Sequence, residues 1–189
     1  MTQKLAVLVS GSGTLLDAIV AAQIPVALVV ADRPCLGLDK AKEQGIETIL
    51  VPRGDFKPNG VFDREAYTQF VVDKLVENSI TFVSMAGWMT IFTSPIFTAF
   101  GENIINNHPS LLPKHKGEKA VEDALAAGDK VTGCTIHVAT LKLDDGPILA
   151  QAEVPVLPGD TIDSLHTRIK EAEYPLLVKV LREQLGISQ

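Results

Sequence analysis

The chain has 189 residues, of which 46% are apolar and 21% charged, and 17 Lys and Arg face 23 Asp and Glu for a formal net charge of −6. This is the composition of a globular protein, and it excludes a disordered chain. The length predicts one domain spanning residues 1–189, with halves of about 1–100 and 101–189. The net acidity argues against a nucleic-acid partner.

Neither the cysteines nor the apolar runs indicate secretion or a membrane. Cys35 and Cys134 are too few for a disulfide framework, and there is no C-x-x-C motif. The first apolar run, Leu5 to Val9, is too short to span a bilayer or to form the core of a signal peptide. We therefore expect a cytoplasmic protein that binds no metal.

Along the chain, short apolar runs alternate with longer helical patterns. Strands are predicted at Lys4–Ser10, Pro25–Ala31, Ile46–Val51, Ile80–Ala86, Asn103–Asn106, Val131–Thr140 and Pro147–Val156. Helices are predicted at Thr14–Ala22, Leu38–Gly45, Phe62–Leu75, Glu118–Ala127 and Ile162–Leu185, with a polar loop at Pro52–Gly60. The alternation predicts an α/β fold with a mostly parallel twisted sheet and helices on both faces. The last two strands are expected to form an antiparallel pair.

The first strand leads into a glycine turn, Ser10-Gly11-Ser12-Gly13-Thr14, and Thr14 is expected to cap the helix that follows. Such a turn lets an anion approach the backbone and the N–H groups at a helix start, which favours a phosphate site. The alternative is a tight turn without a ligand. Asp32 stands where a ribose-binding acid would follow, but Leu16 replaces the third glycine of a dinucleotide site, so a single phosphate is preferred.

The most informative segment follows the fifth predicted strand. Asn106 and His108 lie two residues apart at a strand end, so they point to the same face, and Pro109 keeps His108 extended. An amide and an imidazole together can hold a developing oxyanion and move a proton. Asp144 or Asp145, in a later loop, is expected to reach the imidazole and favour its cation. Against this stand two simpler readings, a histidine that caps a loop and an ordinary Asp-Asp-Gly-Pro turn.

Other enzyme classes find no support. The chain has no G-x-S-x-G, H-E-x-x-H or P-loop motif, and the spacing of His108, His115 and His137 matches no metal site. His137 is expected to have a secondary role on its strand. Trp88, with Met89 and Phe92, is interpreted as core or as the lining of an apolar pocket.

Together the opening VLVSGSGT and the runs NHPSLLPKHKG, VTGCTIH and LDDGPILAQAEVPV resemble the folate-dependent formyltransferases, from about Leu5 to Leu181. The resemblance implies a Rossmann-like formyltransferase fold. It also implies that the formyl group of 10-formyltetrahydrofolate, a co-substrate, is transferred to the amine of 5'-phosphoribosylglycinamide in purine synthesis. The expected partners are small molecules, and the protein is expected to be a monomer or a homodimer.

The same resemblance assigns roles to individual residues. The catalytic residues would be Asn106, His108 and Asp144. The ribonucleotide would be bound in the first half by Gly13, Thr14 and Leu15, and from the last helix by Lys170 and Glu173. Folate would contact Arg64, Met89, Thr90, Ile91, Phe92 and Asn106, and the loop from Val138 to Asp144 would close over the pterin.

Four positions depart from the family pattern. Leu15 stands where Asn is usual, Thr90 where Arg is common, and His115 where an aromatic residue is common, and Lys116-Gly117 replaces a frequent Pro-Gly. They are expected to change affinity rather than reaction type. Two other functions remain as alternatives: a formyltetrahydrofolate hydrolase, and a non-catalytic nucleotide-binding module that uses Asp32.

Overall fold

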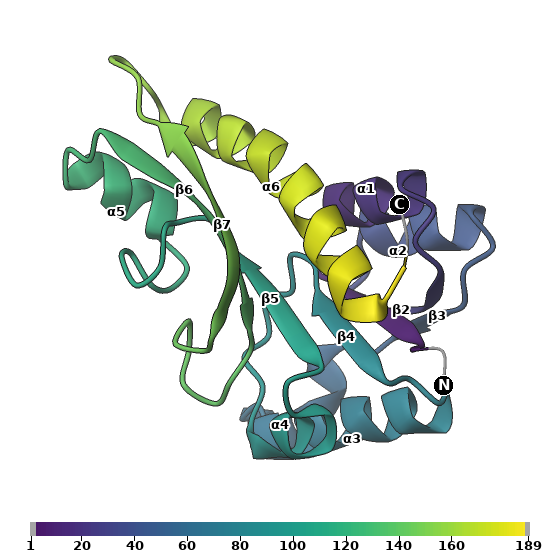
Figure 1. Cartoon of the computed structure of the whole chain (residues 1–189). Helices are drawn as coiled ribbons and strands as arrows, with labels where there is room; N and C mark the ends of the chain where they lie inside the picture. The colour runs from purple at the N-terminus through teal and green to yellow at the C-terminus, as the bar shows by residue number, and fades with distance from the viewer. Residues whose placement is uncertain (1–2, 188–189) are drawn as a thin grey trace. The chain divides into compact units, whose positions relative to one another are not determined.

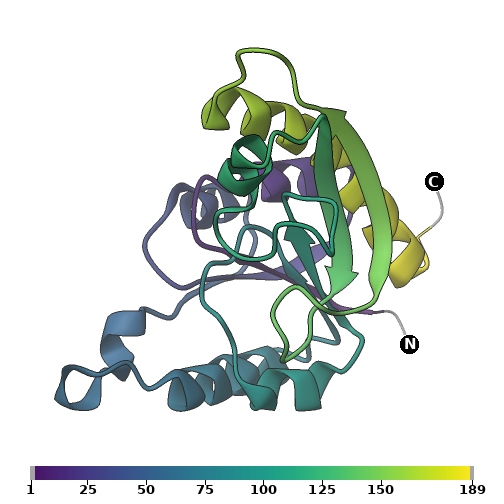
Figure 2. The same ribbon diagram turned by 90° about the vertical axis from the view of Figure 1, so that its left-hand side faces the viewer.

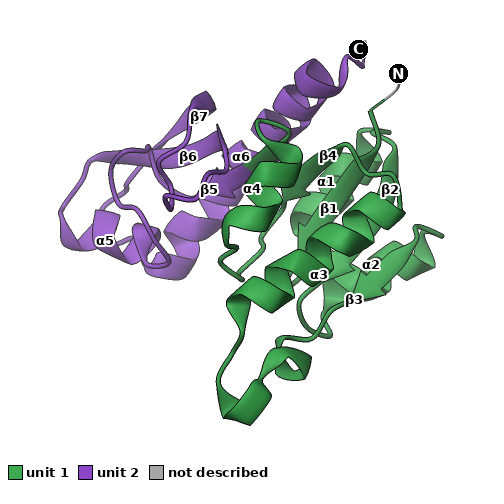
Figure 3. Cartoon of the chain, turned by 90° about the horizontal axis from the view of Figure 1, so that it is seen from below, with its two compact units in different colours: residues 1–105 green, residues 106–189 purple. Residues whose placement is uncertain are grey.

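The computed structural model describes residues 3–187. The chain divides into two compact units, residues 1–105 (unit 1) and residues 106–189 (unit 2), drawn in different colours in Figure 3. Each unit combines strands with helices. Within the described residues, no helix is both long and apolar enough to cross a membrane.

Unit 1 is built on parallel strands. They are β1 (Leu5–Val9), β2 (Val26–Ala31), β3 (Thr48–Leu50) and β4 (Phe82–Met85), in the spatial order β3-β2-β1-β4 (Figure 1). β1 pairs in parallel with β2 and β4, and β2 pairs in parallel with β3. No residue of β1 is more than 1% exposed. Its unbroken apolar run is typical of a strand that is covered on both faces.

The helices of unit 1 partly match the prediction. They are α1 (Thr14–Ala21), α2 (Leu36–Glu43), α3 (Arg64–Glu77) and α4 (Ser94–Phe100). The prediction missed α4, which is too short to show a helical period. The expected loop contains two short 3₁₀ helices, η1 (Arg53–Phe56) and η2 (Pro58–Gly60). The expected cap at Thr14 was wrong, because Gly13 occupies the N-cap position and no side chain caps α1.

Unit 2 contains the antiparallel strand pair. Its elements are β5 (Ile104–His108, whose first two residues belong to unit 1), α5 (Ala120–Ala126), β6 (Val131–Val138), β7 (Ile148–Pro155) and α6 (Ile162–Leu185). The strand order is β5-β6-β7, and β6 and β7 run antiparallel, side by side in Figure 2. The predicted strand pair is therefore confirmed.

The long helix α6 covers the strand pair, and its bounds are those predicted. Thr161 and Ser164 form a capping box at its start, and it continues through Pro175 to Gly186, which is left-handed. Leu165 and Ile169 of α6 pack in one buried cluster with residues of α5, β6 and β7, namely Val121, Cys134 and Val154. Burial of this cluster holds the helix against the strands.

Gly133 of β6 provides a test of the strand pairing. A Cβ atom there would lie 1.9 Å from the backbone oxygen of Ala152 and 2.8 Å from Leu111 Cδ2. Because a backbone atom cannot move aside cheaply, Gly133→Ala is expected to lower the free energy of unfolding by more than about 2 kcal/mol in urea titration. Gly54→Ala is the control, since a Cβ at Gly54 meets no atom within 4 Å. Equal stability of the two variants would contradict the pairing.

Candidate active site

The end of β5 presents its polar side chains in alternation. Asn106 Nδ2 lies 3.3 Å from His137 Nε2, and His108 Nδ1 lies 3.5 Å from Asp144 Oδ2. Between them, Asn107 Nδ2 donates instead to Glu173 Oε1 of α6 at 2.9 Å. This alternation follows from the pleat of a strand. It brings Asn106 and His108 together, as the spacing predicted.

His137 fixes the orientation of the Asn106 amide, a role that the sequence reasoning only partly foresaw. His137 Nδ1 donates to the backbone oxygen of Val138 at 2.9 Å, so Nε2 is left as the acceptor for Asn106. Burial lowers the pKa of His137, which keeps this ring neutral. The amide N–H that does not bind His137 is then available to an incoming oxygen atom. The signal in the sequence was that His137 lies two residues after Thr135 on the same strand, so that the two polar side chains share one face of β6.

His108 has an acceptor at each ring nitrogen. Nε2 lies 2.8 Å from the backbone oxygen of His115, and Nδ1 faces the carboxylate of Asp144. Only an imidazole with both nitrogens protonated satisfies both acceptors. The side chains of His108 and Asp144 are 6% and 4% exposed, so water screens this pair little. The arrangement suits a group that donates a proton.

The structure also distinguishes the two adjacent acids. Asp144 Oδ2 accepts from the backbone N–H of Gly117 at 2.8 Å and faces His108. Asp145 instead pairs with Lys116 and Lys142, whose hydrogen bonds lower its pKa to about 2. Asp144 is therefore the carboxylate that reaches the imidazole, and Asp145 holds the loop from outside.

The loop that follows His108 is held by a buried hydroxyl. Thr135 Oγ1 donates to the backbone oxygen of Ser110 at 2.6 Å and accepts from the backbone N–H of Leu112 at 3.1 Å. Gln151 Nε2 of β7 donates to the same hydroxyl at 2.9 Å. All three hydrogen bonds of the hydroxyl are used. The loop after β5 is thereby tied to both strands of the antiparallel pair.

Glu173 is a buried acid next to this strand end. It is 4% exposed, and this burial raises its pKa to about 7, against the opposing effects of the hydrogen bond from Asn107 and the charge of Lys170. Asn107 Oδ1 is buried and has no hydrogen-bond partner among the described residues. The predicted pair Lys170 and Glu173 thus shares one part of α6, with Asn107 beside it.

In unit 1 the glycine turn has the geometry that an anion site requires. Gly13 has a φ of +71°, and a Cβ atom on it would lie 2.5 Å from Gly37 Cα. Only glycine fits there, so the chain passes close to α2 and enters α1 directly. The first N–H groups of α1, including those of Thr14 and Leu15, have no acceptor within the helix. They are available to a phosphate.

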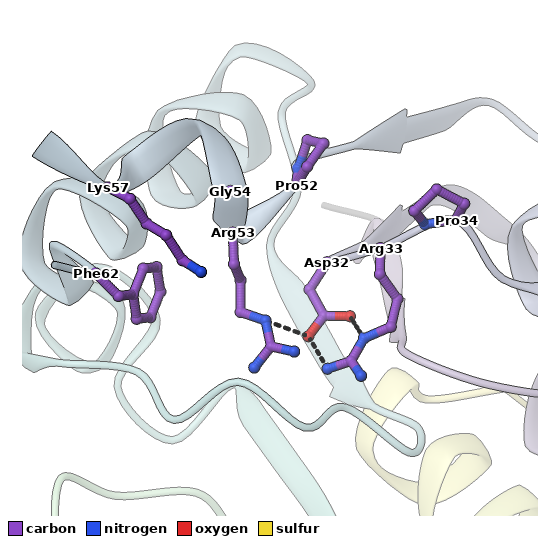
Figure 4. Close-up of a pocket in the computed structure, with 8 residues that line it drawn as sticks. All are labelled: Asp32, Arg33, Pro34, Pro52, Arg53, Gly54, Lys57 and Phe62. Atoms are coloured by element: carbon purple, nitrogen blue, oxygen red, sulfur yellow. Dashed lines mark hydrogen bonds and ion pairs between the residues drawn. The ribbon is translucent and has the colours of Figure 1, made fainter. Parts of the chain in front are cut away.

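Asp32 does not act as a ribose-binding acid. Its side chain is fully buried, and its two oxygens accept from Arg33 at 3.0 and 3.1 Å and from Thr90 Oγ1 at 2.6 Å. Burial opposes ionisation, but the hydrogen bonds from Arg33, Thr90 and Ser10 lower the pKa. Because both oxygens are engaged inside unit 1, as Figure 4 shows for the bonds from Arg33, Asp32 has a structural role, which argues against the dinucleotide reading.

The predicted folate segment after β4 alternates between exposed and buried side chains. Met89 and Ile91 are 50% and 47% exposed, whereas Thr90 and Phe92 are 3% and 4% exposed. Arg64, at the start of α3, is exposed. Met89 and Ile91 therefore offer apolar contacts, and Thr90 and Phe92 hold the segment. Trp88 Nε1 and Thr93 Oγ1, which flank it, are buried without a hydrogen-bond partner among the described residues.

Within residues 3–187, no group of three or more His, Cys, Asp or Glu is arranged to hold a metal ion. His115 binds Asp129 through Nε2 at 2.9 Å, away from His108 Nδ1 and its partner Asp144. The rings of His108 and His137 both face Asp144, at 3.5 and 3.8 Å, so only the His115 ring uses a different carboxylate.

The formyl transferase family matches residues 3–181 of the chain. The chain belongs to the formyl transferase family. The chain is similar to the phosphoribosylglycinamide formyltransferase of Bacillus subtilis (strain 168). The two are 32% identical over an alignment of 193 residues, gaps included, which covers 98% of this chain and 96% of that protein. The structure of glycinamide ribonucleotide transformylase 1 from Symbiobacterium toebii matches with a TM-score of 0.89 and 36% identity, covering 98% of this chain and 88% of that one. These comparisons confirm the predicted Rossmann-like fold.

Longer relatives contain the formyl transferase domain as one part. The trifunctional purine biosynthetic protein adenosine-3 of Drosophila melanogaster is 35% identical over 181 residues, which cover 91% of this chain but 13% of that protein. Across the fly, bovine, chicken and human trifunctional proteins, the chain spans 13 to 18% of their length.

The buried acid of this formyl transferase gives a pH-dependent prediction. A carboxyl whose folded-state pKa is about 7, above its ordinary 4.5, binds more protons when folded, so the free energy of unfolding falls as the pH rises from about 4.5 to about 7. Glu173→Gln is expected to remove this loss. At about pH 8 the variant should be more stable than the parent by up to about 3 kcal/mol, with no difference below about pH 4.

Urea titration across that pH range measures the effect. Glu171→Gln is the matched control, because Glu171 lies on the same helix and is exposed. A stability difference for Glu173→Gln that does not change with pH would contradict the assignment.

Proposed function

We propose that the protein transfers the formyl group of 10-formyltetrahydrofolate to the amine of 5'-phosphoribosylglycinamide. The observation that carries the proposal is the group of Asn106, His108 and Asp144, in which an oriented amide and an imidazole facing a buried carboxylate lie together in unit 2. Similar full-length bacterial proteins bear the name of this activity. The reaction belongs to purine synthesis.

The geometry supports a direct transfer. The substrate amine attacks the formyl carbon, and the formyl oxygen becomes an oxyanion that accepts a hydrogen bond from Asn106 Nδ2. It also accepts from His108 Nε2, taking the place of the His115 backbone oxygen as the acceptor of that N–H. Such donors act most strongly in a site that excludes water. The new C–N bond forms, the bond to N10 of the folate breaks, and the proton lost by the amine is delivered to N10. Asp144 keeps the His108 ring protonated and oriented for this delivery.

The arrangement within each unit supports the proposed binding roles. The N–H groups of Gly13, Thr14 and Leu15 suit the substrate phosphate, and Lys170 and Glu173 suit polar groups of the ribonucleotide. For the folate, exposed Met89 and Ile91 supply apolar contacts and Arg64 a positive charge. We further propose small molecules as the only partners, a monomer or homodimer, no metal requirement and a cytoplasmic location.

The formyl-transfer assay separates this proposal from its alternative, a formyltetrahydrofolate hydrolase. The protein is incubated with 10-formyltetrahydrofolate, with and without 5'-phosphoribosylglycinamide. Formylated product that appears only with the ribonucleotide supports the proposal. Formate released at the same rate without the ribonucleotide would identify a hydrolase, in which water takes the place of the amine. Absence of both products from a folded protein would contradict both activities.

Removal of the imidazole tests the catalytic assignment. His108→Ala is expected to lower kcat by about 10²–10⁴-fold, the range for loss of a general acid or base, while the melting temperature stays within a few degrees. His166→Ala is the control, since His166 lies on α6 in the same unit outside the proposed group. A His108→Ala variant with kcat near that of the parent would overturn the mechanism.

Removal of the carboxylate charge tests the role of Asp144. Asp144→Asn retains the acceptor for the Gly117 N–H but no longer favours the protonated imidazole. The alkaline limb of the kcat–pH profile is therefore expected to move to lower pH, as measured by formyl transfer at a series of pH values. If the profile keeps its position and kcat merely falls, Asp144 does not act through the charge of His108.

A further inference from the structure

Residues 115–117 form a strap that contacts two of the proposed catalytic residues through backbone atoms. The backbone oxygen of His115 accepts a hydrogen bond from His108 Nε2 at 2.8 Å, and the backbone N–H of Gly117 donates to Asp144 Oδ2 at 2.8 Å. The facing atoms of His108 and Asp144 are 3.5 Å apart, so the strap contacts both members of this pair. The position of the strap therefore bears on the orientation of the imidazole and of the carboxylate.

Two acids outside the catalytic group hold the side chains of the strap. His115 Nε2 lies 2.9 Å from Asp129 Oδ2, and Lys116 Nζ pairs with Asp145. The side chains of His115 and Asp129 are 16% and 17% exposed, whereas those of Lys116 and Asp145 are 35% and 32% exposed. Because water screens an exposed pair more than a buried one, the contact with Asp129 is the stronger of the two anchors.

His115 has a backbone conformation that needs such an anchor. Its φ is +51°, in the left-handed region that residues other than glycine seldom adopt. The buried Oγ of Ser110 donates to the backbone oxygen of Lys114 at 2.6 Å and lies 3.3 Å from that of His115, which supports the turn from below. The contact of the His115 ring with Asp129 supports it from the side-chain end. A strained residue persists only where its surroundings hold it in this way.

Asp129 is itself fixed by the end of α5. Its backbone N–H donates to the oxygen of Ala124 at 3.2 Å, and α5 packs through Val121 in the buried cluster that holds α6 against the strands. Lys114 Nζ also lies 3.4 Å from the carboxylate, but this lysine side chain is 64% exposed and so fixes it little. Asp129 therefore connects the strap to the hydrophobic core of unit 2.

We propose that Asp129 is a positioning residue for the reaction, and that it acts on His108 through the ring and the backbone oxygen of His115. Before the substrates bind, this oxygen is the acceptor of the N–H that the oxyanion later takes over. It keeps the N–H aligned and the imidazole turned toward Asp144, so that little reorganisation is left for the transition state. The effect on formyl transfer rests on the proposed function, whereas the effect on the imidazole does not.

Formyl-transfer kinetics tests the effect on the reaction. Asp129→Ala is expected to lower kcat about tenfold and to change KM for either substrate by less than about twofold, because the displaced group acts in the transition state and not in binding. Asp129→Asn retains an oxygen acceptor for the His115 ring and is expected to restore kcat to near the parent value. An Asp129→Ala variant with the kcat of the parent, or with a higher one, would overturn the proposal.

Two further variants keep the kinetic test specific. Lys114→Gln is the control, because it removes the other cation near Asp129 and leaves the His115 contact, so kcat should not change. His115→Ala breaks the same contact from its other side and is expected to lower kcat as Asp129→Ala does. The double variant Asp129→Ala/His115→Ala should be no slower than either single variant, since residues that act through one contact are not additive. Additive losses would contradict the shared contact.

The imidazole of His108 gives a readout that needs no catalysis. In protein with isotope-labelled histidines, the Nε2–H of His108 is expected to give an NMR signal that exchanges slowly with water, and His108→Ala identifies this signal. In Asp129→Ala the signal should exchange faster and broaden, because the His115 oxygen no longer holds the N–H, whereas in Lys114→Gln it should remain as in the parent. Melting temperatures close to that of the parent separate this local effect from unfolding.

The NMR signal and the rate together distinguish the proposal from the proposed function. A faster-exchanging signal and a lower kcat in Asp129→Ala support the positioning role. A signal that is unprotected in the parent, or unchanged in Asp129→Ala, contradicts it. If the parent transfers no formyl group but the signal depends on Asp129, the proposed function is contradicted and the positioning of His108 by Asp129 is supported.

Discussion

A buried carboxylate, Asp144, imposes the main constraint on the candidate active site. Removing a carboxylate from water costs several kcal/mol unless donors replace the lost hydration. Asp144 obtains a backbone N–H from Gly117 and faces the rings of His108 and, at 3.8 Å, His137. These groups come from β5, the loop before α5, and β6. The groups that compensate for the burial of Asp144 are therefore the same groups that make it chemically useful.

Unit 1 also has a buried carboxylate, Asp32, but this one has a structural role. Asp32 follows β2 at the position where a ribose-binding acid is expected, but Arg33 and Thr90 fill its oxygens. A carboxylate whose oxygens already accept hydrogen bonds within the protein has little capacity left to bind a ribose hydroxyl. An aspartate at a strand end can thus have a structural role instead of binding ribose. Its hydrogen-bond partners, and not its spacing in the sequence, decide between the two roles.

Periodicity and strand-end polarity were sufficient to predict much of the fold and the relation between Asn106 and His108. The bounds of α6 were predictable because its capping box and Gly186 are local signals. The partners of the side chains in the candidate site were not predictable from such local signals. The choice of Asp144 over Asp145, and the contact of His137 with Asn106, depend on loops and strands brought together by packing. The short helix α4 was missed because seven residues show barely two turns.

Three of the departures from the family pattern have one feature in common. The Leu15 side chain is 6% exposed, and the Thr90 hydroxyl binds Asp32. The His115 ring binds Asp129, while its backbone oxygen accepts from the His108 imidazole. At each position the side chain has a partner or a buried place within the protein. Because backbone groups are common to all residues, side chains at these positions can change as long as their internal contacts are satisfied.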